Sequence, residues 1–179
     1  MIGYGVIGTG MMGLEHIYNV LHLEGATVTA VSDPDEGSRA KGREAAGLPK
    51  DAAFADHRDL IASERCDAVV VASPNYTHAA ILDDVLATDL HILVEKPLCT
   101  TVDDCRRVAD AAAARTPVTW MALEYRYMAP IARLLTEVRN GAAGTVQMVA
   151  IREHRFPFLE KVGDWNRLRR NTGGTLVEK

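Results

Sequence analysis

Short apolar runs alternate with segments whose apolar positions recur at helical spacing along residues 1–122. Runs of this kind predict strands that are largely buried in a sheet. The expected strands are 4–7, 26–31, 66–72, 91–94 and 117–122. The expected helices are 11–24, 35–46, 56–64, 78–87 and 101–114. Regular alternation of strand and helix predicts a doubly wound α/β domain with a parallel sheet.

Residues 123–179 follow a different pattern. The expected elements, in order, are a helix over 129–140, a turn at 141–144, a strand over 146–152, a long basic connection over 155–171, and a helix or strand that opens at 172. One strand and one helix cannot bury a sheet face. We therefore expect an incomplete α+β domain here, which either pairs with another chain or belongs to a longer protein.

Three glycines follow the first expected strand in a G-x-G-x-x-G arrangement, which is typical of dinucleotide-binding folds. Gly8 permits the tight turn, Gly10 lets the backbone approach a pyrophosphate, and Gly13 lets helix and strand pack closely. The pyrophosphate would lie on the unpaired N–H groups of the helix N-terminus, where the helix dipole favours negative charge. The candidate cofactor-binding residues here are Gly8, Thr9, Gly10, Met11, Met12 and Gly13. Taken alone, the pattern also fits a glycine-rich turn without a ligand.

Asp33 ends the second expected strand, 20 residues after Gly13. An acidic side chain at this place would hold the adenosine ribose hydroxyls of a dinucleotide, and its charge would repel a 2′-phosphate. Asp33 therefore favours NAD over NADP as the cofactor. The alternative is a turn or N-cap residue before Pro34.

Polar and turn-forming residues also follow the next two buried strands. Since the carboxyl ends of parallel strands meet at one edge of the sheet, where ligands bind, we expect these residues to converge on the glycine turn. The candidates are Ser73, Pro74, Asn75 and His78 after one strand, and Glu95 and Lys96 after the other. Lys96 could hydrogen-bond a substrate hydroxyl and help to move its proton beside the nicotinamide.

Each of these residues also has a structural interpretation. Glu95 and Lys96 could form an ion pair at the strand end, and Pro74–Asn75 is a common turn pair. His78 could pack or hydrogen-bond locally near the start of a helix. Glu95 could either orient Lys96 or hold a ribose hydroxyl.

The composition of the chain excludes several classes of function and adds no further candidate site residue. The chain has 179 residues, 47% of them hydrophobic, and a net charge of −4, which gives no sign of nucleic-acid or anionic-membrane binding. Cys66, Cys99 and Cys105 have no zinc or redox spacing, and an odd count without a signal peptide suggests reduced thiols in the cytoplasm. We expect no metal site, no nucleophilic Ser or Cys arrangement and no membrane span.

In its glycine turn and in the residues at its strand ends, the chain resembles the Gfo/Idh/MocA oxidoreductase family. The motifs that carry the resemblance run through almost the whole chain, and the most specific is the Glu-Lys-Pro sequence at the end of a buried strand. They are Gly8–Gly13, Pro74-Asn75 with His78, Glu95-Lys96-Pro97-Leu98, Tyr125-Arg126-Tyr127 with Pro130, the turn 141–146, and Trp165 with Gly173-Gly174.

The resemblance implies an N-terminal Rossmann domain over 1–122 and the start of a larger substrate and oligomerisation domain over 123–179. It implies NAD(P)-dependent hydride transfer with a small sugar or polyol, Lys96 as a catalytic residue, and a homo-oligomer in the full-length form. Arg126 and Tyr125 match a segment that lines the cleft between the domains, which makes Arg126 a candidate cofactor-binding residue; the alternative is a solvent-facing pair in a linker. Glu178 falls on an acidic catalytic position, where aspartate is more usual, and the family's catalytic histidine would be residue 182.

Other interpretations of the chain's function stay open. The chain could be a non-catalytic dinucleotide-binding or regulatory module, and some family relatives use tightly held NAD for hydrolysis through a transient oxidation. Arg152 and His154, on the expected strand and just after it, could face the substrate. Trp165 and the basic residues Arg167, Arg169 and Arg170 could face substrate or cofactor, or could form a solvated loop.

Overall fold

The computed structural model describes residues 1–152, 154 and 160–178. The chain forms two compact units. The first contains residues 1–122 together with 164–179, and the second contains residues 123–163. The candidate residues at the strand ends all lie in the first unit.

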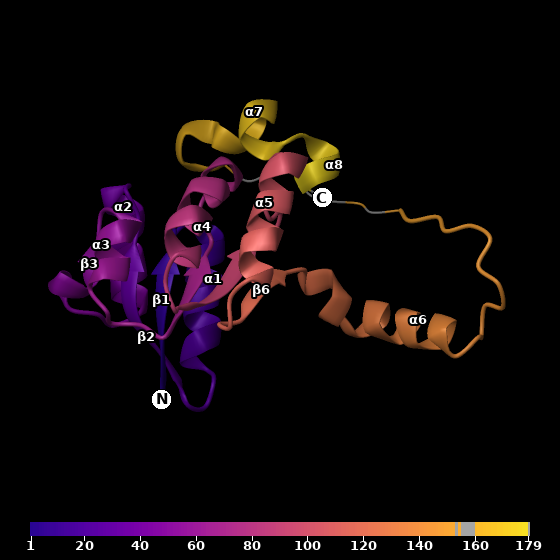
Figure 1. Ribbon diagram of the computed structural model, residues 1–179, viewed down its shortest axis with the longest axis horizontal. Coiled ribbons are helices and arrows are strands. Elements are labelled where there is room, and N and C mark those ends of the chain that lie inside the picture. Colours follow the sequence, from indigo (N-terminus) through magenta and orange to yellow (C-terminus); the bar gives the residue numbers. More distant parts are fainter. Residues whose placement is uncertain (153, 155–159, 179) are drawn as a thin grey trace. The chain divides into compact units, whose positions relative to one another are not determined.

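The first unit is built on a six-stranded parallel sheet with the order β3-β2-β1-β4-β5-β6. Figure 1 shows its strands among the helices that connect them. The strands are β1 (Ile2–Ile7), β2 (Ala26–Ser32), β3 (Ala53–Phe54), β4 (Ala68–Val71), β5 (His91–Glu95) and β6 (Thr119–Ala122). The strand order reverses direction at β1, which is the doubly wound arrangement of Rossmann folds. The expected fold class is confirmed.

Helices connect the strands throughout. They are α1 (Met11–Leu21), α2 (Glu36–Ala45), α3 (His57–Ala62), α4 (His78–Leu86) and α5 (Val102–Ala113), with short 3-10 turns at η1 (Lys50–Ala52) and η2 (Asn75–Thr77). Thr101 caps α5 by accepting a hydrogen bond from the Asp104 N–H at 3.1 Å. Asp35 and Asp56 cap α2 and α3 in the same way.

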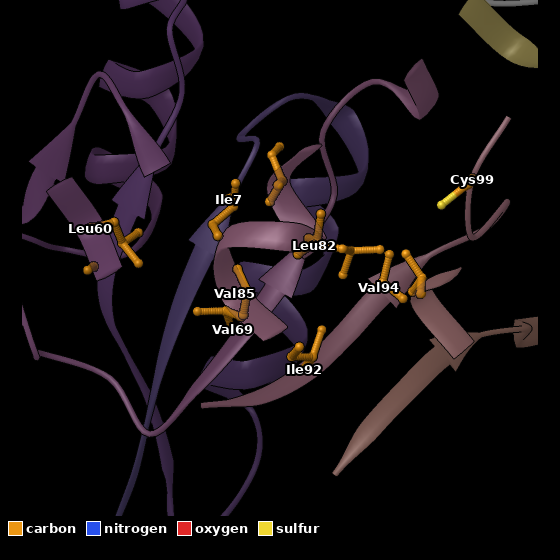
Figure 2. Packing of buried hydrophobic residues seen from close by; sticks show 12 residues of the cluster. Ile7, Leu60, Val69, Leu82, Val85, Ile92, Val94 and Cys99 are labelled. Carbon is orange, nitrogen blue, oxygen red and sulfur yellow. The ribbon is translucent and has the colours of Figure 1, made fainter. Parts of the chain in front are cut away.

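The sheet buries an apolar layer on each face. Val70 of β4 packs with Ile17 and Val20 of α1 on one face. Its neighbours Val69 and Val71 pack with Leu82 and other residues on the opposite face, as alternation along a strand requires. Figure 2 shows this second cluster, in which Leu82 and Val85 of α4 lie against the sheet beside Val69 and Val94.

Several element bounds differ from the expected ones. Helix α1 ends at Leu21 rather than at residue 24, and a turn over residues 22–25 leads into β2. Strand β3 has only two residues, too few to show an apolar pattern, and it was not expected. Strand β4 is shorter than the apolar run 66–72.

The second unit contains η3 (Glu124–Tyr127) and α6 (Ala129–Arg139), with Pro130 in the first turn of α6 as expected. The expected strand Val146–Arg152 is wrong, because these residues have no regular structure. A strand needs a hydrogen-bonded neighbour, and none of the described residues pairs with this segment.

The expected loop Arg155–Asn171 is wrong in its described part. Residues 162–167 form η4 (Val162–Arg167), and α7 (Arg169–Thr172) follows. Residues 155–159 lie outside the described residues. After Gly173, which has a left-handed backbone (φ +79°), the chain forms α8 (Thr175–Glu178), so the last element is a helix. Among the residues that the structure describes, no helix combines the length and the apolar character needed to cross a membrane.

Helix α1 packs on the glycine turn without room for a side chain at Gly13. A Cβ at this position would lie 2.0 Å from the backbone oxygen of Gly8. The oxygen belongs to the backbone of the turn, and the added Cβ would be fixed to the backbone of α1, so neither atom could move without a shift of the main chain. Gly13 therefore has the packing role that the sequence predicts.

We expect Gly13→Ala to lower the free energy of unfolding by about 3 kcal/mol, because the new methyl group forces α1 away from the turn. The measurement is urea denaturation followed by far-UV circular dichroism. Gly37→Ala on α2 is the matched control, since its Cβ would meet only a side-chain atom of Asp35 at 3.4 Å. Equal stability of the Gly13 and Gly37 variants would contradict this packing.

Candidate functional site

The carboxyl ends of four neighbouring strands lie level with one another. In the strand register Ile7 is opposite both Ser32 and Val71, and Val71 is opposite Val94. The next residues along each strand are therefore brought to one edge of the sheet. These are the glycine turn, Asp33, the segment from Ala72 to Asn75, and Glu95 with Lys96. The expected convergence of these candidates is confirmed by the register.

The glycine turn presents backbone rather than side chains at the start of α1. Gly8 has φ +89°, and a Cβ on it would lie 2.6 Å from the Cα of Ser73, so this turn requires glycine. Gly10 is the N-cap of α1 without a side-chain hydrogen bond, and a Cβ on it would have no heavy atom within 4 Å. The open side of Gly10 and the first N–H groups of α1 together form an anion-binding arrangement. Met11 and Met12 are partly exposed beside it.

Thr9 and Asp33 are joined to each other across the turn. The carboxylate of Asp33 accepts a hydrogen bond from the Thr9 N–H at 2.8 Å, and its other oxygen accepts one from the Asp35 N–H at 2.9 Å. The N-cap of α2 is Asp35, so the alternative that Asp33 is an N-cap residue is wrong, whereas its turn role is observed. An ionised carboxylate has about four acceptor positions. Ribose binding by Asp33 thus stays a prediction that these contacts permit.

The segment after β4 places Asn75 at the start of η2. Its side chain is buried, and among the described residues its Nδ2 atom has no hydrogen-bond partner. A buried amide donor without a partner is costly, so it marks a place where a bound group could accept a hydrogen bond. The neighbouring Tyr76 ring meets Trp165 edge-on, with the ring centroids 6.4 Å apart. Trp165 therefore packs beside the Ser73–Asn75 segment.

His78 joins the two loops that carry the other candidates. Its ring is fully buried, with Nδ1 2.9 Å from the Pro97 carbonyl oxygen and Nε2 3.0 Å from the Ser73 carbonyl oxygen. Burial lowers the pKa of this imidazole, although the nearby carbonyl groups and Glu95 oppose that shift. A neutral ring carries one N–H and donates to one carbonyl at a time, whereas a protonated ring donates to both. The contact with Ser73 is the local hydrogen bonding expected as the alternative, whereas the contact with Pro97 joins residues distant in sequence. Direct cofactor contact by His78 stays a prediction.

Glu95 ends β5 and Lys96 follows it, and a residue that the sequence did not single out lies beside them. Glu95 is buried, and its Oε2 accepts a hydrogen bond from the Lys96 N–H at 3.1 Å, which agrees with an orienting role. Its Oε1 lies 2.8 Å from Nε2 of His16 on α1. Lys96 is half-buried, and its peptide bond to Pro97 is cis. His16 comes three residues after Gly13, a spacing that could have pointed to the same helix face.

Other candidates are not brought to this edge by the described contacts. Arg126 and Tyr125 lie in η3 of the second unit, and Arg152 and His154 are exposed in that unit. Arg167, Arg169 and Arg170 are exposed in and around η4 and α7. Glu178 ends α8, and its side chain lies outside the described residues. Within the described part of the chain, no group of three or more His, Cys, Asp or Glu residues could hold a metal ion.

Comparisons with known proteins agree on one family. The chain is 41% identical over 114 residues to inositol 2-dehydrogenase 1 of Saccharopolyspora erythraea. This match covers 62% of this chain and 33% of that protein. It is 36% identical over 153 residues to inositol 2-dehydrogenase of Gluconacetobacter diazotrophicus. That match covers 83% of this chain and 44% of that protein. The chain thus spans less than half the length of these relatives.

A solved structure supports the same relationship. The myo-inositol dehydrogenase of Lactobacillus casei, in complex with NAD(H) and myo-inositol, matches with a TM-score of 0.72 at 33% identity. The match covers 79% of this chain and 42% of that chain. The Gfo/Idh/MocA model, described as an oxidoreductase family with an NAD-binding Rossmann fold, matches residues 2–123. The chain therefore belongs to the Gfo/Idh/MocA oxidoreductase family.

Proposed function

We propose that this chain binds NAD at the carboxyl edge of its parallel sheet and supplies the cofactor half of a dehydrogenase site for a sugar or polyol. The observation that carries the proposal is the combination of an open glycine at the start of α1 with a buried, unpartnered Asn75 amide among the described residues. The first suits a pyrophosphate, and the second suits a hydrogen-bond acceptor on a bound group.

The reaction follows from the residues beside this edge. Oxidation of an alcohol removes a hydride from carbon and a proton from oxygen. NAD supplies the hydride acceptor when it is bound. Lys96 is the group that hydrogen-bonds the substrate hydroxyl and takes its proton, and Glu95 holds the Lys96 backbone through their hydrogen bond.

The relatives support the substrate class. Two are named inositol 2-dehydrogenases, and the L. casei enzyme was solved with myo-inositol. We accordingly propose a cyclic polyol or sugar as substrate, residues 123–179 as the opening of a substrate domain, and homo-oligomer formation in the full-length protein. The free thiols of Cys66, Cys99 and Cys105 fit the reducing cytoplasm expected from the sequence.

Titration calorimetry of the 179-residue chain with NAD and with NADP tests the cofactor assignment. We expect a single site that prefers NAD. A turnover assay with a panel of inositols and hexoses separates the two readings of the chain. NAD binding without turnover would favour a dinucleotide-binding module, and absence of NAD binding would remove the proposal.

We expect Gly10→Ala to weaken NAD binding by at least about tenfold, because the methyl group enters the space next to the pyrophosphate. The same methyl group meets no heavy atom of the protein within 4 Å, so the thermal unfolding midpoint should not change. Unchanged NAD affinity in a folded Gly10→Ala protein would show that the glycine turn is not the pyrophosphate site.

Asp33→Asn should lower the preference for NAD over NADP by about tenfold, because it removes the charge that repels a 2′-phosphate. The substitution keeps one oxygen, which can accept the Thr9 N–H, and gives up the hydrogen bond from the exposed Asp35 N–H, so the turn should persist. Asp35→Asn is the matched control, since asparagine also caps helices and Asp35 lies only two residues away. Equal preferences in the two variants would remove Asp33 from cofactor selection.

In a protein that carries this chain with a complete substrate domain, Lys96→Ala should lower kcat by about 10²–10⁴. NAD affinity should change little, because the phosphate-binding turn is untouched. Lys41→Ala, on the exposed side of α2, is the control. Normal turnover by Lys96→Ala would exclude Lys96 as the proton-transfer group.

A further inference from the structure

The contact between His16 and Glu95 links two parts of the site that the backbone does not join. His16 lies in the second turn of α1, and Glu95 lies 79 residues later at the end of β5. Strand β4 separates β1 from β5 in the sheet. The side chains therefore reach across one strand from the helix that follows the glycine turn to the strand that precedes Lys96.

The chemistry of the pair fixes the direction of the hydrogen bond. A carboxylate only accepts, so Nε2 of His16 carries the proton in its 2.8 Å contact with Oε1 of Glu95. The side chains of His16 and Glu95 are only 16% and 10% exposed, so water competes little for the contact. The other oxygen, Oε2, accepts from the Lys96 N–H. One carboxylate thus joins the α1 side chain to the Lys96 backbone.

The two neighbours of β5 in the sheet pair with it to different points. The pairing of β5 with β4 stops at Val94, opposite Val71, whereas the pairing with β6 continues to Glu95, opposite Ala122. The β4–β5 register therefore ends one residue before Glu95. The hydrogen bonds of the Glu95 side chain constrain the peptide where the ladder has ended.

We propose that His16 is a positioning residue, which acts through Glu95 to hold the Lys96 backbone in a fixed place relative to α1. The catalytic meaning of this role rests on the proposed function, in which α1 binds the cofactor and Lys96 takes the proton. The distance between these two elements then decides whether a cofactor and a substrate can meet correctly.

Two substitutions separate the hydrogen bond from simple packing. His16→Leu keeps apolar volume but removes the donor. His16→Gln retains an N–H group at similar reach and should restore the contact. His22→Leu is the matched control, because His22 follows the same helix, is exposed, and has its Nδ1 2.7 Å from the carbonyl oxygen of Tyr18 rather than near Glu95.

The first readout is the backbone amide of Lys96 in ¹H–¹⁵N spectra of the 179-residue chain. His16→Leu should move this amide proton upfield, because Glu95 is freed to turn away, and should speed its exchange with solvent. His16→Gln should return the signal towards its wild-type position, and His22→Leu should leave it unchanged. An unmoved Lys96 amide in folded His16→Leu protein would overturn the proposal, as would equal shifts in the Leu and Gln variants.

The second readout is NADH affinity, measured by fluorescence titration. We expect His16→Leu to weaken it about three- to tenfold and His16→Gln to restore it. Loss of affinity in both variants would overturn the hydrogen-bond role and favour packing of the ring. If His16→Leu does not fold, Glu95→Gln replaces it, and this variant should move the Lys96 amide in the same direction. If the wild-type chain does not bind NADH, the proposed function fails, and the amide readout still decides the role of His16.

Discussion

The turn after β1 and the turn after β4 pack so closely that only glycine fits at position 8. A Cβ there would lie 2.6 Å from the Cα of Ser73. The same region is fixed by backbone hydrogen bonds, from the Gly8 N–H to the Ser32 oxygen and from the Ala72 N–H to the Ile7 oxygen, both at 2.8 Å. These contacts lock the ends of three strands together. The open backbone of Gly10 and the buried amide of Asn75 owe their common location to this packing.

Most of the first unit could be predicted because its information is local. Apolar runs mark the strands, helical spacing marks the helices, and Thr101 marks a helix start through its own side chain. The glycine turn could be predicted from its local G-x-G-x-x-G spacing, although only the close contact of Gly13 with Gly8 is local and the contact of Gly8 with Ser73 joins residues distant in sequence. Parallel alternation then implied which strand ends would meet, and the register agrees.

The remainder depends on contacts between distant residues. The residues around His16 in sequence do not predict its contact with Glu95, which lies 79 residues away. The residues around Asp33 likewise do not predict that its carboxylate accepts the Thr9 N–H. Strand β3 is defined by its pairing with β2 rather than by a pattern of its own. Residues 146–152 show the converse, because a strand-like sequence forms no strand without a neighbour to complete its hydrogen bonds. Side-chain roles at the site therefore needed the tertiary structure.

The division of the first unit into two stretches of sequence has an entropic consequence. The chain leaves this unit after Ala122 and rejoins it at Asp164, so the intervening 40 or so residues form a closed loop. In the unfolded chain, bringing together two points about 40 residues apart costs about 3 kcal/mol of conformational free energy. The segment that begins at Asp164 must offset this free-energy cost with its own contacts, such as the edge-on packing of Trp165 on Tyr76. Residues 164–179 are thus expected to join a sheet that has already folded, and to be the first part of the unit to detach when it is destabilised.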